Sequence, residues 1–171
     1  MIEIKHLSKS YNRGSEKAVD DLNLNVRPGE IFGFLGPNGA GKTTTIKMMV
    51  GLLNPDSGTI RLAGFDTAEN PLEAKRQTGY VPDNPDVYDR LTGIEYLNFL
   101  ADVYEVPVKE RHGRILQFLD MFDLADAVGD LIKSYSHGMK QKIVLTGALL
   151  HNPAVWILDE PMVGLNPKSS H

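Results

Sequence analysis

Cysteine is absent from this sequence of 171 residues. Without a thiol, the protein cannot form disulfide bonds or cysteine–zinc sites, and its chemistry cannot depend on a cysteine nucleophile. A chain without cysteine also suits a reducing compartment such as the cytosol.

An excess of basic residues is missing as well. The formal net charge is −4 and the pI is about 5.7, so no net positive field would attract nucleic acid, and we expect no nucleic-acid partner. Long apolar runs are also missing, because stretches such as IVLTGALL (143–150) are much shorter than the roughly 20 residues that cross a bilayer. Any link to a membrane would then depend on a partner or on the protein surface.

The composition is that of an ordinary globular protein, with 42% hydrophobic and 23% charged residues. The helix expected over 108–122 is amphipathic, because its apolar residues recur at helical spacing and so lie on one face. The strand expected over 155–158 should be buried. The order of elements predicts an α/β core that is interrupted by a mostly helical insert at 84–150. Periodicity and turn signals predict strands over 2–4, 22–26, 30–36, 57–64, 78–83 and 155–158, and helices over 43–53, 93–106, 108–122 and 138–151.

The segment GPNGAGKTTT (36–45) fits the phosphate-binding pattern G-x-x-x-x-G-K-[ST]. Its glycines allow the backbone to fold around phosphate with N–H groups pointing inward, and the following helix N-terminus favours negative charge. The Lys42 side chain can reach the β and γ oxygens of a nucleotide, and the Thr43 hydroxyl can bind Mg²⁺. The alternative is a glycine-rich turn before a surface helix, but this loop is expected between an apolar strand and a helix, as phosphate binding requires.

Two acids follow the apolar segment VWIL. A strand at 155–158 would place Asp159 near the metal, and Glu160 could orient or deprotonate the attacking water. Two solvated acids at a strand end are the alternative. That alternative becomes minor when the same chain carries a phosphate loop.

Five motifs occur in an order that one family uses: GPNGAGKTTT, GYVPDNPDVYDRLTG, SYSHGMKQK, ILDEP and GLNP. With them, essentially the whole chain resembles the nucleotide-binding subunit of an ABC transporter. It is most similar to bacterial ATPases that pair with separate export permeases. The resemblance implies an α/β fold with a P-loop NTPase core over 1–83 and 151–171, which includes an antiparallel β subdomain. A helical subdomain with the signature motif would occupy 84–150.

The resemblance also implies roles for single residues. Tyr11 would stack on adenine, although an ordinary surface tyrosine is the alternative. Thr43, Asp159 and Asp83 would hold Mg²⁺, and Lys42 and Glu160 would be catalytic. The nucleotide-binding residues implied in this way are Tyr11, Gly36, Asn38, Gly39, Ala40, Gly41, Lys42, Thr43 and Thr44.

The segment YSHGM matches the part of the family signature that is usually written LSGGQ. By that resemblance, Ser136, His137 and Gly138 would hold the phosphate bound by the opposite subunit of a head-to-tail homodimer. His137 and Met139 depart from the usual letters. The alternative is a plain helix start in which Ser136 is the N-cap.

Three further departures from the family pattern carry expectations. Asp83 stands where the family usually has glutamine, and it could still reach Mg²⁺ by way of water. Asn166 stands where the family prefers aspartate, which puts communication between subunits in doubt. The family also has a histidine some thirty residues beyond the position of the GLNP segment. His171 lies too close to that segment to be this histidine. We therefore expect a C-terminally truncated domain with a largely complete nucleotide site and incomplete hydrolysis machinery.

The activity implied by the resemblance is ATP hydrolysis, with ATP and Mg²⁺ as cofactors. ATP would close a homodimer and hydrolysis would reopen it, while residues 84–97 pass the motion to a transmembrane permease. The subunit would then be cytoplasmic, on the inner face of the cell membrane through that permease. One alternative is a nucleotide-binding chain with little turnover. Another is a GTPase or a small kinase, although the N-K-x-D element that reads guanine is absent from the sequence. A third is a soluble ABC ATPase that acts on DNA or ribosomes.

Overall fold

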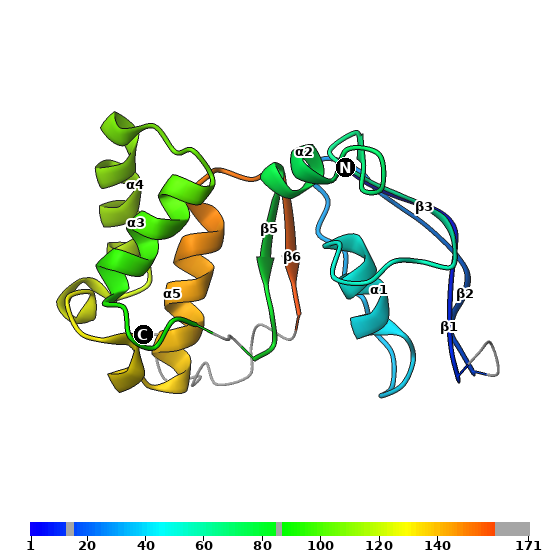
Figure 1. Cartoon of the computed structure of the whole chain (residues 1–171), viewed down its shortest axis with the longest axis horizontal. Helices are drawn as coiled ribbons and strands as arrows, with labels where there is room; N and C mark the ends of the chain where they lie inside the picture. The colour runs from blue at the N-terminus through cyan, green and yellow to red at the C-terminus, as the bar shows by residue number, and fades with distance from the viewer. Residues whose placement is uncertain (13–15, 85–86, 160–171) are drawn as a thin grey trace. The chain divides into compact units, whose positions relative to one another are not determined.

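The computed structural model describes residues 1–12, 16–84 and 87–159 of the chain (Figure 1). These residues form two compact units. The first unit comprises Met1–Gly79 with Ala154–Ile157, and the described part of the second comprises Tyr80–Pro153 with Leu158 and Asp159.

A four-stranded antiparallel sheet is the framework of the first unit, with the strand order β2-β1-β3-β4. Strand β1 has partners on both edges, so that Ile4 lies opposite Leu24 on one side and Ile60 on the other. This double pairing carries the first two strands well beyond the short segments predicted from alternation. The strands are β1 (Ile2–Tyr11), β2 (Glu16–Val26), β3 (Ser57–Leu62) and β4 (Phe65–Asp66).

Two helices complete the first unit, α1 (Lys42–Met49) and α2 (Pro71–Arg76). Helix α1 ends four residues earlier than the predicted limit of 53. Gly51 adopts a φ of +73°, a left-handed conformation that glycine accepts without the strain of a Cβ atom and that ends the helix. The chain then turns back, and the N–H groups of Leu52 and Leu53 both donate to the Lys47 carbonyl.

The prediction of a strand over 30–36 is wrong. This segment has no regular secondary structure, and the side chains of Ile31 and Leu35 are 100% and 94% exposed. A strand requires a neighbouring strand to receive its N–H and C=O groups. Among the described residues, the segment is not paired with any strand, so its apolar composition is not enough to make it one.

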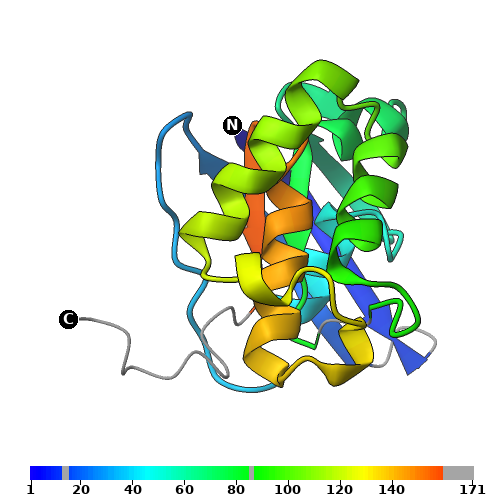
Figure 2. The ribbon, with the colours of Figure 1, turned by 90° about the vertical axis from the view of Figure 1, so that its left-hand side faces the viewer.

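Three helices pack against one another in the second unit: α3 (Gly93–Val103), α4 (Val108–Met121) and α5 (His137–Leu149). Figure 2 looks onto these helices. Helix α3 begins with a capping box, in which Thr92 and Glu95 each bond the backbone of the other. Two short 3₁₀ turns, η2 (Ala125–Ala127) and η3 (Ile132–Ser134), connect α4 to α5. The three helical predictions for this region are confirmed.

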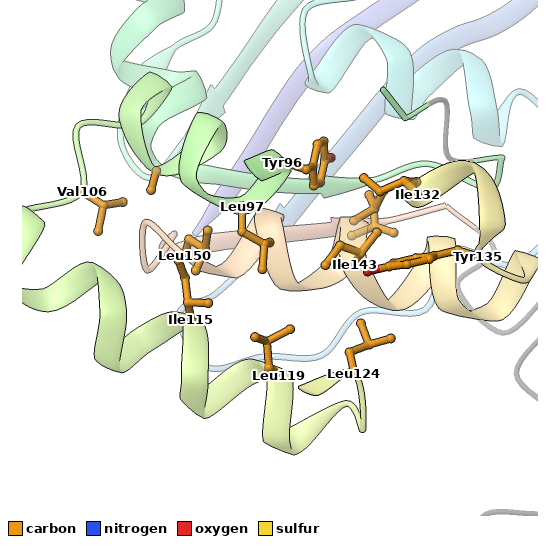
Figure 3. Packing of buried hydrophobic residues seen from close by; sticks show 13 residues of the cluster. Tyr96, Leu97, Val106, Ile115, Leu119, Leu124, Ile132, Tyr135, Ile143 and Leu150 are labelled. Atoms are coloured by element: carbon orange, nitrogen blue, oxygen red, sulfur yellow. The ribbon is translucent and has the colours of Figure 1, made fainter. Parts of the chain in front are cut away.

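One hydrophobic core lies between these helices (Figure 3). The predicted apolar face of α4 contributes to it, with Ile115 and Leu119 buried and Phe118 packed against them. Leu97 from α3 and Ile143 from α5 are fully buried in the same cluster. The helical unit therefore has a core of its own.

The strands β5 (Thr78–Val81) and β6 (Val155–Leu158) form a second, two-stranded sheet. The Val155 N–H donates to the Gln77 carbonyl, and the Asp159 N–H donates to the Val81 carbonyl, both at 2.9 Å. The predicted β6 is present, but it is buried on one face only, because Trp156 and Leu158 are exposed. The pairing brings the ends of both strands to the same edge of this sheet.

Candidate functional site

The phosphate loop folds around the side chain of its own lysine. The Lys42 ammonium donates to the carbonyl oxygens of Gly36 and Pro37, the second at 2.9 Å. The loop is closed by a turn in which the Ala40 N–H donates to the Pro37 carbonyl. Gly39 and Gly41 both have a φ of +82°, which a residue with a side chain adopts only at a cost. The loop thus holds a positive charge over a glycine-rich backbone.

Helix α1 starts directly after this loop. No side chain of the described residues caps its N-terminus, and its first turn contains no acidic residue. Thr45 is buried and its hydroxyl donates to the Gly41 carbonyl, whereas Thr43 is exposed. The positive end of the helix dipole and the Thr43 hydroxyl are therefore available to an anion and its metal ion.

The phosphate loop packs against the hairpin that carries Tyr11. A Cβ atom on Gly41 would lie 2.2 Å from the Ala18 carbonyl oxygen and 3.2 Å from the Val19 side chain. Ala18 is in β2, two residues from Glu16, which pairs with Tyr11 at the end of β1. Tyr11 is 41% exposed. The structure thus brings the hairpin that bears the predicted adenine-stacking residue against the phosphate loop.

The two aspartates predicted to bind metal lie near each other in the second unit, where β5 and β6 end. Asp159 is half-buried and Asp83 is exposed. Burial raises the pKa of the Tyr80 phenol, and the negative charges of Asp159 and Asp83 raise it further. One phenol therefore senses both carboxylates. Carboxylate oxygens such as those of Asp159 and Asp83 are hard ligands that fit Mg²⁺. Within residues 1–12, 16–84 and 87–159, no group of three or more acidic or histidine side chains is arranged to hold a metal ion.

The signature segment lies at the start of α5. The Ser136 hydroxyl accepts a hydrogen bond from the Met139 N–H at 3.2 Å, so Ser136 is the N-cap of this helix. The alternative, a helix start with Ser136 as its N-cap, is therefore observed. Ser136 and His137 are also exposed. In the first turn, the Lys140 ammonium pairs with Asp89 at 2.7 Å.

Several predicted functional residues lie outside the described residues. They include the catalytic candidate Glu160, the departure at Asn166 and the terminal His171. Sequence reasoning also did not single out two residues that support the site, Ala18 and Asp56. No sequence signal identifies Ala18, because it contacts the loop through its backbone. Asp56 lies just after Asn54-Pro55 and can be recognised only from its contacts with β1.

A family model described as ABC transporter matches residues 19–163. The chain belongs to the ABC transporter family. It is 42% identical over 167 residues to the bacitracin transport ATP-binding protein BcrA of Bacillus licheniformis, covering 98% of this chain and 53% of that protein. It is 39% identical over 168 residues to the daunorubicin/doxorubicin resistance ATP-binding protein DrrA of Streptomyces peucetius, covering 98% and 50%. The chain therefore spans about half the length of the curated relatives it matches.

Solved structures agree with this ABC assignment. One described as an ATP-binding subunit of an ABC transporter superposes with a TM-score of 0.91 at 36% identity, covering 98% of this chain and 69% of that one. The dimeric ATP-binding cassette MJ0796, in a post-hydrolysis state bound to ADP and Pi, gives a TM-score of 0.86 at 27% identity, covering 98% and 77%. The P-loop ATPase fold and the ABC identity predicted from the motifs are confirmed. Within the part of this ABC chain that the structure describes, none of the helices is long and apolar enough to cross a bilayer.

Proposed function

We propose that this chain is the ATP-binding and ATP-hydrolysing motor subunit of an ABC exporter, and that it energises a separate transmembrane permease. The observation that carries the proposal is the phosphate loop, in which the Lys42 ammonium lies over a glycine backbone at the uncapped start of α1. The similarity to proteins named for bacitracin transport and for daunorubicin/doxorubicin resistance supports an export role.

In this proposal, the phosphate groups of ATP take the place of the two loop carbonyls as partners of Lys42. The backbone N–H groups from Gly36 to Thr44 cradle the phosphates, and Tyr11 stacks on the base. Mg²⁺, held by Thr43, Asp159 and Asp83, would neutralise charge on the transferred phosphoryl group.

Turnover requires a nucleophile as well as a bound nucleotide. We assign Glu160 to orient or deprotonate the attacking water. Ser136, His137 and Gly138, at the start of α5, contact the nucleotide of a second subunit, which gives a head-to-tail homodimer. Residues 1–83 and 151–171 then form the ATPase core and 84–150 the helical subdomain that contacts the permease on the cytoplasmic face of the membrane. No nucleic-acid partner is part of this proposal.

Binding and turnover of MgATP test the proposal. Replacing Lys42 with Ala removes the positive charge from the loop, so ATP affinity should fall roughly tenfold or more and ATP hydrolysis should be lost. Lys47→Ala is the matched control, because Lys47 is an exposed lysine in the last turn of the same helix. Calorimetry would measure affinity, and phosphate release would measure turnover.

Three outcomes would change the assignment. Equal ATP affinity in the Lys42→Ala variant and the unmodified protein would contradict nucleotide binding at this loop. Tight binding with only background phosphate release would assign the chain by itself a nucleotide-binding role without turnover. A strong preference for GTP over ATP in a competition experiment would indicate a different P-loop enzyme.

A further inference from the structure

Asp56 binds three consecutive residues at the end of β1, directly before Tyr11. Its carboxylate accepts from the Lys9 ammonium at 2.6 Å and from the Ser10 N–H at 2.7 Å. Its own N–H donates to the Ser8 carbonyl at 3.0 Å. The Lys9 side chain is only 15% exposed, so the ion pair is held against the sheet.

The bonds of Asp56 take the place of strand pairing where β3 no longer pairs with β1. The ladder between β1 and β3 stops at Ser8 opposite Ser57, after a register shift. Beyond Ser8, the pairing of β1 among the described residues is with β2, through Ser10 and Tyr11. The carboxylate of Asp56 therefore gives the Ser10 N–H the partner that β3 no longer supplies.

Asp56 also lies at the end of a short connection from α1. The N–H groups of Leu52 and Leu53 donate to the Lys47 carbonyl, which ties this connection to the last turn of α1. Lys42, at the start of the same helix, is the phosphate-binding lysine. Through Asp56, the helix that would bind the phosphates is thus bonded to the strand that ends in Tyr11.

The carboxylate is ionised at neutral pH. The hydrogen bond from the Lys9 ammonium lowers the pKa of Asp56, and the bond from the Ser10 N–H lowers it further. Because Asp56 is partly exposed, this ion pair contributes little to global stability. Its removal should therefore loosen the end of β1 without unfolding the protein.

We propose that Asp56 is a positioning residue that holds Tyr11 at the distance from the phosphate loop that a nucleoside triphosphate requires. The inference rests on the proposed function, in which Tyr11 stacks on the base. Asp56 touches neither phosphate nor base. It acts through the backbone of Ser10 and the side chain of Lys9.

The test compares ATP with inorganic triphosphate, which has phosphates but no base. Stacking on an aromatic side chain contributes about 1–3 kcal/mol per base, equivalent to roughly 5- to 150-fold in affinity. Asp56→Ala should remove part of this stacking contribution. The Kd for ATP should therefore rise about 3- to 10-fold, while the Kd for triphosphate stays unchanged. In a Tyr11→Ala background, the same substitution should have no further effect on ATP binding.

Two more variants sharpen the comparison. Asp56→Asn retains one oxygen acceptor and the size of the side chain, and it should give an intermediate loss of ATP affinity. Glu3→Ala is the matched control, because Glu3 pairs with Lys5 at the other end of the same strand. It should bind ATP and triphosphate as the unmodified protein does.

The inference would be overturned by an equal loss of affinity for ATP and triphosphate, which indicates a general structural role. It would also be overturned by additive effects of the Asp56 and Tyr11 substitutions, or by unchanged ATP affinity in Asp56→Ala while Tyr11→Ala weakens it. Failure of the proposed function gives different results. In that case the unmodified protein binds neither ligand, or Tyr11→Ala binds ATP normally and Asp56 has nothing to position.

Discussion

Gly41 lies so close to Ala18 that a Cβ atom on Gly41 would stand 2.2 Å from the Ala18 carbonyl oxygen. The neighbour is backbone and cannot rotate away as a side chain could. This contact joins the phosphate loop to the hairpin formed by β1 and β2. Glycine at position 41 is thus required by packing as well as by its φ of +82°.

Gly41→Ala should therefore be more harmful than Gly39→Ala. Both glycines have a φ of +82°, but no atom of the described residues lies within 4 Å of a Cβ built on Gly39. We expect Gly39→Ala to lower the free energy of unfolding by about 1 kcal/mol, the cost of a left-handed alanine. Gly41→Ala should lower it by about 3 kcal/mol, because the clash adds to that cost. Urea unfolding would measure both, and equal losses would contradict the contact with Ala18.

Ser136 should have two separable roles. As the N-cap of α5, its hydroxyl accepts from the Met139 N–H, so Ser136→Ala should lower the free energy of unfolding by about 1 kcal/mol. Ser136→Asn keeps a capping oxygen and should be nearly as stable as the unmodified protein. If Ser136 also contacts the nucleotide of a second subunit, both variants should hydrolyse ATP more slowly. Normal turnover in the stable Asn variant would limit Ser136 to the cap.

Two glycines inside helices should respond to alanine with opposite signs. A Cβ atom on Gly147 of α5 would lie 2.3 Å from the Leu100 side chain of α3. A Cβ atom on Gly113 of α4 would have no atom within 4 Å in the part of the chain that the structure describes. Gly147→Ala should lower the free energy of unfolding by about 1 kcal/mol through overpacking. Gly113→Ala should raise it by about 0.5–1 kcal/mol, because alanine favours the helix. Thermal or urea unfolding checks both values, and a stabilising Gly147→Ala would show that Leu100 repacks freely.

Tyr96 should make the protein less stable at alkaline pH. Burial raises the pKa of Tyr96 from 10.0 to about 12, with smaller contributions from Tyr104 and Tyr88. Because the folded state prefers the neutral phenol, the stabilisation is complete below the unfolded pKa of 10.0 and is lost as pH rises towards 12. The resulting loss in the free energy of unfolding reaches about 1 kcal/mol at about pH 11 and approaches about 3 kcal/mol above the folded pKa.

Tyr96→Phe removes the ionisable group and serves as the comparison for this pH effect. Urea unfolding at about pH 8 and about pH 11 should show a smaller loss of stability in the variant than in the unmodified protein. The two proteins differ only in this one hydroxyl group, so the difference between their pH dependences reports on Tyr96. An identical pH dependence of the two proteins would contradict the shift.

Much of the architecture could be predicted because its signals are local. The helices α3, α4 and α5 follow from apolar spacing, as Ile115 and Leu119 illustrate. The phosphate loop can be recognised from the fixed spacing of its glycines and lysine. The prediction over 30–36 failed for the opposite reason. Ile31 and Leu35 look like strand residues, but strand formation depends on a neighbour that local composition does not supply.

By itself, the sequence determined which residues can bind phosphate and in what order the motifs occur, because a tight loop and a helix start depend on neighbours within a few positions. Only the tertiary structure decided what supports that loop. The contact of Gly41 with Ala18 and the bonds of Asp56 to Lys9 and Ser10 join residues 23 to 47 positions apart. Such contacts arise from the packing of the sheet and leave no periodic pattern in the chain.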